Sequence, residues 1–117
     1  MFDITKNKII TVTRGDSFSL DVFVNVGTAI NPVQYVLSGE DKLYFALMEA
    51  HQPFEYALIR KEFTEDDVNE NGDVHMEFGG DMTEYLVPGT YYYTIKLVTE
   101  DGDISTVISK TKFCIID

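Results

Sequence analysis

The chain has 117 residues, of which 20 are Asp or Glu and 9 are Lys or Arg, so its formal net charge at pH 7 is −11. This length suits one domain, residues 1–117, with a core large enough to fold without disulfides. Phosphate backbones and anionic lipid surfaces repel so acidic a chain, so we expect no nucleic-acid partner and no membrane partner.

Localisation signals are sparse in this sequence. The N-terminus has no apolar stretch of the length that a secretory signal needs, and no apolar run approaches the ~18 residues of a membrane span. The single cysteine, Cys114, lies in an apolar run, cannot form an internal disulfide and is expected to be a small buried core residue. We therefore expect synthesis in the cytoplasm.

Alternation of apolar and polar residues predicts strands along most of the chain. The alternation is clearest at residues 17–26, where every even-numbered position is apolar and Phe23 is the one apolar residue on the polar face. The last expected strand is either one long strand or two strands joined by a bulge. In chain order, we expect strands at residues 9–13, 17–26, 33–37, 43–48, 55–63, 72–78, 91–98 and 104–116.

Turn residues separate these strands. Asn71-Gly72 and Asp101-Gly102 are hairpin signals, and Pro88-Gly89 marks a tight turn before a strand that begins with three tyrosines. Residues 81–85 are the only expected helical turn, with Asp81 as its N-cap. Seven to eight short strands with frequent turns predict an all-β antiparallel sandwich or a small barrel, of which we favour the sandwich. Because Trp is absent, an immunoglobulin domain with its inter-sheet disulfide is excluded.

The loop before the strand at 72–78 is the best candidate metal site. Residues 67–72 match an EF-hand loop through its glycine, but the closing glutamate is displaced and flanking helices are missing. A polar hairpin loop is therefore the favoured interpretation and no metal is assigned. A weak calcium site remains open, with oxygen ligands from Asp66, Asp67, Asn69, Asn71 and Asp73.

Catalytic patterns are missing from the sequence. The two histidines, His51 and His75, do not have the spacing of zinc ligands, and the serines lack a nucleophile-elbow motif. The clustered carboxylates of an acidic chain are expected to be solvated. We therefore predict that the protein is not an enzyme, with no catalytic and no cofactor-binding residues.

Two aromatic side chains fall on predicted polar strand faces. Phe23 interrupts the polar face of residues 17–26, and Tyr92 lies opposite the core-facing Tyr91 and Tyr93. Exposed aromatic side chains contribute large apolar area to protein–protein interfaces. Phe23 and Tyr92 are therefore the candidate interface residues.

Two groups of motifs resemble a family of small bacteriophage virion proteins. One comprises Asp-x-Thr at 81–83, Leu-x-Pro-Gly-x-Tyr-x-Tyr at 86–93, the hairpin at 101–102 and the start of a closing strand at 106–109. The other is the strand and Arg-Gly-Asp-Ser-Phe turn at 10–18. Among these proteins, the motifs resemble the N-terminal β-sandwich domain of upper baseplate proteins in phages of Gram-positive bacteria.

The resemblance covers roughly half of the chain and implies an immunoglobulin-like antiparallel β-sandwich used in a tail, baseplate, fibre or capsid surface. It implies no catalytic residues, and it gives the Arg-Gly-Asp at 14–16 a structural role as a turn. The expected function is a virion structural module that contacts other virion proteins and forms a homo-oligomer within an assembly. The expected location is the virion, after synthesis in the bacterial host. The alternative is a calcium-dependent carbohydrate- or cell-surface-binding module that uses the loop at 66–73.

Overall fold

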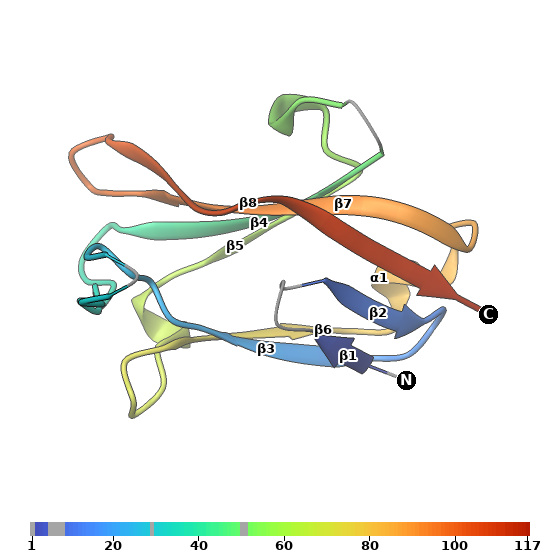
Figure 1. Cartoon of the computed structure of the whole chain (residues 1–117), viewed down its shortest axis with the longest axis horizontal. Helices are drawn as coiled ribbons and strands as arrows, with labels where there is room; N and C mark the ends of the chain where they lie inside the picture. The colour runs from blue at the N-terminus through green and yellow to red at the C-terminus, as the bar shows by residue number, and fades with distance from the viewer. Residues whose placement is uncertain (1, 5–8, 29, 50–51) are drawn as a thin grey trace.

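The computed structural model describes residues 2–4, 9–28, 30–49 and 52–117 (Figure 1). Within these residues the chain is predominantly β, with eight strands, one short helix and two 3-10 turns. The elements are β1 (Phe2–Ile4), β2 (Ile10–Thr13), β3 (Phe18–Val22), β4 (Lys42–Met48), η1 (Phe54–Tyr56), β5 (Ile59–Phe63), η2 (Glu65–Asp67), β6 (Val74–Phe78), α1 (Asp81–Glu84), β7 (Gly89–Val98) and β8 (Ile104–Ile116).

The strands form two sheets that enclose one core. The larger sheet has the strand order β1-β2-β8-β7-β4-β5, and the smaller pairs β3 with β6. Figure 1 shows β4, β7 and β8 above the pair β3 and β6, with β1 and β2 at the level of the lower layer. The larger sheet is therefore curled around the core.

One strand pair departs from the expected antiparallel arrangement. β2 pairs with β8 in parallel, from Ile10 opposite Phe113 to Thr13 opposite Ile116, whereas every other pair of named strands is antiparallel. The amide of Arg14 continues this ladder by donating to the carbonyl of Ile116 at 2.8 Å. The expectation of a wholly antiparallel fold is wrong at this pair, because the chain crosses from one sheet to the other between β2 and β3.

Alternation along the strands sorts their residues between core and solvent as predicted. In β3 and β6 the cross-strand pairs Phe18–Phe78 and Leu20–Met76 are buried. The core centres on aromatic rings, with Phe45 stacked on Tyr93 at 5.3 Å between ring centroids and tilted against Phe78 at 4.7 Å. Burial raises the pKa of the Tyr93 hydroxyl to about 12. Cys114 is only half-buried, so the expectation of a buried core cysteine is wrong.

Several strands and the helix have other boundaries in the structure than the sequence predicts. The strand expected at 33–37 is reduced to one isolated bridge between Gln34 and Asn25. The strand expected at 55–63 begins only at Ile59, because the chain after Pro53 first forms η1. The N-cap of α1 is Gly80 rather than Asp81, which is the first helical residue. β1 was not predicted.

The long final strand and its hairpin follow the predicted pattern. β8 is one strand with a bulge, since its pairing with β7 shifts between Tyr93 and Lys96. The turn at 99–103 is closed by the amide of Gly102, which donates to the carbonyl of Thr99 at 2.8 Å. Gly102 has a φ of 89°, a left-handed conformation that glycine adopts without strain.

Candidate functional site

The Arg-Gly-Asp turn at 14–16 packs against the short helix α1. The amide of Gly15 donates to the hydroxyl of the fully buried Thr83 at 2.9 Å, and Gly15 has a φ of 86°. The carbonyl oxygen of Gly15 lies 2.1 Å from the position that a Cβ on Gly80 would take. The guanidinium of Arg14 pairs with the carboxylate of Asp117 at 3.1 Å. The turn therefore joins the two strand layers through specific packing.

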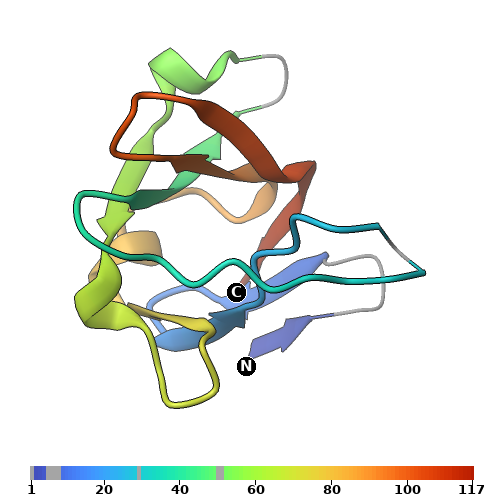
Figure 2. The same ribbon diagram turned by 90° about the vertical axis from the view of Figure 1, so that its left-hand side faces the viewer.

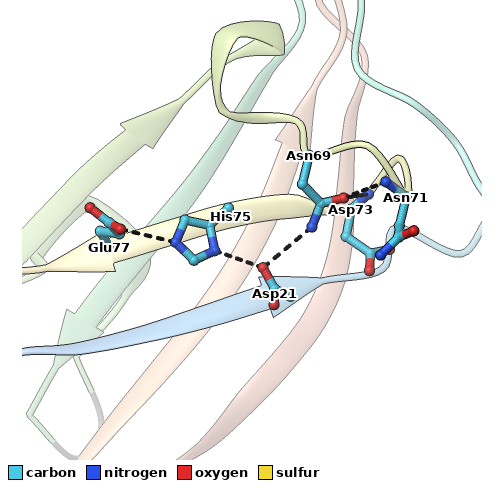
Figure 3. Close-up of polar contacts among 6 residues, drawn as sticks. All are labelled: Asp21, Asn69, Asn71, Asp73, His75 and Glu77. Carbon is cyan, nitrogen blue, oxygen red and sulfur yellow. Dashed lines mark hydrogen bonds and ion pairs between the residues drawn. The ribbon is translucent and has the colours of Figure 1, made fainter.

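In the candidate calcium loop, side-chain oxygens accept hydrogen bonds that hold the loop in shape (Figure 3). Asp67 accepts from the amide of Thr64 at 2.9 Å in a capping box at the start of η2. The side-chain oxygen of Asn69 accepts from the amides of Asn71 and Asp73 at 2.9 and 3.1 Å. Such Asx turns stabilise tight loops without a ligand.

The remaining candidate ligands of this loop are engaged or exposed. One carboxylate oxygen of Asp73 accepts from the side-chain amide of Gln34 at 2.8 Å, and Asp66 is exposed. Among the described residues, no three His, Cys, Asp or Glu side chains are grouped so that they could hold a metal ion. The loop therefore has the geometry of a polar hairpin connection.

His75 lies between two carboxylates on the outer face of the smaller sheet (Figure 3). Its Nδ1 is 2.7 Å from Asp21, its cross-strand partner on β3, and its Nε2 is 3.1 Å from Glu77. Asp21 also accepts a longer hydrogen bond from the side-chain amide of Asn69, at 3.4 Å. With carboxylates at both ring nitrogens, the imidazole has no free nitrogen with which to activate a hydroxyl or water.

The two carboxylates hold the pKa of His75 above its ordinary value of 6.5, with the hydrogen bond to Asp21 as the larger cause and that to Glu77 second. Because the folded-state pKa is raised, protonated His75 stabilises the fold below pH ~6.5 and loses this effect as pH rises through the folded-state pKa. Proton NMR of the imidazole should therefore give a pKa above 6.5, and Asp21→Asn should lower it. An unchanged pKa in Asp21→Asn would contradict this assignment, with His75→Gln identifying the resonance. His51, the other histidine, lies outside the described residues.

The candidate interface residue Phe23 stands at the base of a protruding hairpin, residues 23–36, which Figure 2 shows projecting from the body of the molecule. The aromatic ring of Phe23 is 45% exposed. Four further large apolar side chains of the hairpin are also exposed, at Val26, Ile30, Val33 and Val36. Ile30, at 89%, is the most exposed large apolar residue among the described ones.

Hydrogen bonds hold this hairpin in shape. The amides of Val26 and Tyr35 donate to the carbonyls of Val33 and Val24, both at 2.8 Å. The side-chain oxygen of Asn25 accepts from the amides of Gly27 and Val33 at 2.8 and 3.0 Å. These hydrogen bonds shape the backbone that carries the exposed apolar side chains.

Tyr92, the second candidate interface residue, lies on the outer face of the larger sheet. Its register partners are Met48 on β4 and Lys112 on β8. The side chain is half-buried. Phe23 and Tyr92 therefore lie on different surfaces, and the structure does not bring them together.

Comparison with known proteins finds no protein-family model that matches this chain and no curated protein with significant sequence similarity. In the part of the chain that the structure describes, no helix has the length and apolar character needed to cross a membrane.

Proposed function

We propose that this protein is a non-enzymatic structural module of a bacteriophage virion, acting through protein–protein contacts in a baseplate, tail, fibre or capsid surface. The motifs at 10–18 and 81–109 support this proposal by their resemblance to phage baseplate proteins. The proposal includes an immunoglobulin-like sandwich as the finer description of the fold. It also includes contacts with other virion proteins and with further copies of the chain.

Strand order supports the immunoglobulin-like description. The larger sheet places β8, β7, β4 and β5 side by side, and the smaller sheet pairs β3 with β6. If β3 to β8 are taken as strands B, C, C′, E, F and G, this is the order G-F-C-C′ and B-E of a variable-type domain. The described residues contain no counterpart of strand D, so the match is to the central strands.

A tyrosine near the start of β7 gives independent support. Immunoglobulin-like domains carry a tyrosine near the start of strand F whose hydroxyl bonds to the backbone a few residues upstream. Here the hydroxyl of Tyr91 donates to the carbonyl of Val87 at 2.7 Å. Two residues later, where such domains place a cysteine, Tyr93 is fully buried and stacks on Phe45 of β4. In this description Tyr93 takes the position of the strand F cysteine, and its ring contact with Phe45 lies within the larger sheet.

The observation that carries the contact-based function is the apolar hairpin at 23–36. Five large apolar side chains are exposed there on a hydrogen-bonded backbone, which is typical of a surface that a partner covers. Both ring nitrogens of His75 face carboxylates, which gives no support to a catalytic alternative. A protein partner could cover the exposed apolar side chains of this protruding hairpin.

Gene neighbourhood provides the first test of the virion assignment. We expect the gene to lie beside genes for portal, capsid, tail-tube or tape-measure proteins, whereas a metabolic operon would contradict the assignment. The second test is incorporation of the chain into particles. The double variant Val26→Asp/Ile30→Asp should fold normally, since both side chains are exposed, yet co-sediment poorly with particles. Tyr85→Asp/Val87→Asp, at positions 86% and 75% exposed outside the hairpin, makes the same charge change and is the matched control.

Calcium titration tests the alternative, a calcium-dependent carbohydrate- or cell-surface-binding module. Because Asp67, Asn69 and Asp73 already accept hydrogen bonds within and around the loop, we expect no binding heat and no rise in melting temperature. A ligand that binds only the folded state raises its stability, so a clear calcium-dependent rise would favour the alternative.

A further inference from the structure

Positive charge is concentrated on one surface of this acidic protein. Of the seven Lys and Arg residues that the structure describes, five lie on the outer face of the larger sheet, opposite the face that buries the aromatic core. Directly paired residues of neighbouring strands point to the same face of a sheet. Lys96 pairs with Tyr44 and Lys112 pairs with Tyr92, so these side chains share the outer face. We call this surface the cationic face, formed by Lys42, Arg60, Lys96, Lys110 and Lys112.

Aromatic rings lie among these cations. Phe54 of η1 folds over the sheet, with its ring centroid 6.4 Å from that of Tyr44. The guanidinium carbon of Arg60 is 5.2 Å from the ring of Phe54, and the ammonium nitrogen of Lys96 is 4.9 Å from it. A pocket of about 270 Å³ adjoins Phe54, with Lys96 and Lys110 at its edge. The face thus combines apolar area with positive charge, and aromatic residues and Arg are enriched at protein interfaces.

Ion pairs among the described residues leave most of this positive charge without a carboxylate partner. Glu62 pairs with Lys42 at 2.9 Å, which raises the pKa of Lys42 and lowers that of Glu62. Among the described residues, the other four cations have no carboxylate within ion-pair distance. The ammonium of Lys110 instead donates to the carbonyl of Gln52. The cationic face therefore retains an unmatched charge in a molecule of net charge −11.

Negative charge gathers at one end of the molecule, where three loops meet on the left of Figure 1. The amide of Gly39 donates to Glu65 at 3.1 Å, and the amide of Glu40 donates to Glu100 at 3.4 Å. These loops, residues 38–41, 64–67 and 99–103, contain no Lys or Arg. We call this surface the acidic end, with exposed carboxylates at Glu40, Glu65, Asp66, Glu100, Asp101 and Asp103.

We propose that the cationic face binds the acidic end of a second copy of the same chain. The argument is charge complementarity between two surfaces that every copy carries at different places. Such a contact is heterologous, so each copy can bind one neighbour through its face and another through its end, giving a closed ring or an open filament. This proposal deepens the contact-based function above by naming one partner and its surface.

Salt sets the conditions for observing this contact. At low ionic strength the screening length is about 30 Å, comparable with the molecule itself, so the net charge of each copy repels the next. At about 0.15 M salt the screening length falls to about 8 Å, which leaves mainly the local attraction between face and end. We therefore expect association to be strongest at intermediate salt and to weaken toward 1 M.

A charge-swap experiment tests the proposal by light scattering and sedimentation of the purified full chain at about 0.15 M salt. The face variant Lys96→Glu/Lys110→Glu and the end variant Asp101→Lys/Asp103→Lys should each weaken self-association at least about tenfold. Mixing the two should restore association, because each variant then supplies the charge that the other lost. The control Glu70→Lys/Glu84→Lys makes the same charge change as the end variant but outside the acidic end, and should keep the wild-type mass.

The outcomes separate this proposal from the virion assignment. A wild-type chain that stays monomeric at millimolar concentration would overturn it, as would association that neither variant weakens or that mixing fails to restore. A monomeric wild type that binds polyglutamate through Lys96 and Lys110 would assign the face to another acidic partner, again overturning self-association. The virion assignment is tested by gene neighbourhood and particle incorporation, so it can stand or fail independently.

Discussion

Replacing Phe45 with alanine should lower the free energy of unfolding by about 4 kcal/mol. Phe45 is fully buried at the centre of β4, and its ring contacts aromatic rings from three other strands. The centroid distances are 5.3 Å to Tyr93, 4.7 Å to Phe78 and 6.3 Å to Phe113. Truncation would leave a cavity between the two sheets and remove these ring contacts together.

Urea unfolding followed by circular dichroism measures this loss. Phe45→Leu keeps most of the volume and should cost about 1.5 kcal/mol, which provides a measurable variant if Phe45→Ala fails to fold. Tyr85→Ala removes an aromatic side chain that is 86% exposed and should change the stability by less than about 0.5 kcal/mol. Equal losses in Phe45→Ala and Tyr85→Ala would contradict the position of Phe45 in the core.

Replacing Asp41 with alanine should cost about 3 kcal/mol, because this buried carboxylate joins three parts of the fold. It accepts hydrogen bonds from the hydroxyl of Tyr35 at 2.5 Å, the amide of Ser38 at 3.1 Å and the amide of Glu100 at 3.0 Å. Asp41 is 2% exposed, so its removal leaves partners that water reaches poorly. Asp41→Asn keeps one acceptor oxygen and should lose roughly half as much.

The same residue should make the fold sensitive to acid. The hydrogen bond from Tyr35 is the main cause that lowers the pKa of Asp41 below 3.8, and the same bond is the main cause that raises the pKa of Tyr35 to about 12. Because the folded-state pKa of Asp41 is depressed, its contribution is present above pH ~3.8 and is lost as pH falls through the folded-state value. Unfolding measured between pH 2 and 5 should therefore show a shallower pH dependence in Asp41→Asn. Glu40→Gln, an exposed neighbour, should keep the wild-type slope.

Much of the strand pattern could be predicted because a period of two survives wherever one face of a strand is buried. The strand prediction failed where other interactions determine the conformation of the backbone. Pro53 and the packing of Phe54 over Tyr44 turn the chain before β5, although the sequence there resembles a strand. β1 is too short to show a period, and the parallel pairing of β2 with β8 depends on contacts between distant segments.

The candidate site was less predictable than the fold. Phe23 was identified because it interrupts the polar face of a predicted strand. Nothing in the sequence around Val26, Ile30 and Val33 indicates that these apolar side chains are exposed. The cationic face was missed for a related reason. Its members come from four elements far apart in the chain, and only the register of β4, β5, β7 and β8 brings them to one surface. Charge counted along the sequence showed an acidic protein and concealed this segregation.

The parallel pairing of β2 with β8 also has a consequence for the order of folding. Ile10 must wait for Phe113, its partner about a hundred residues downstream, so this ladder cannot form until synthesis of the domain is almost complete. During translation the emerging chain can first assemble the hairpins and the pair β3 and β6, whose partners are closer together. Closing such a long loop is entropically slow, so docking of the N-terminal strand is a natural last step of folding. A nascent chain would then complete its larger sheet only after β8 has been synthesised.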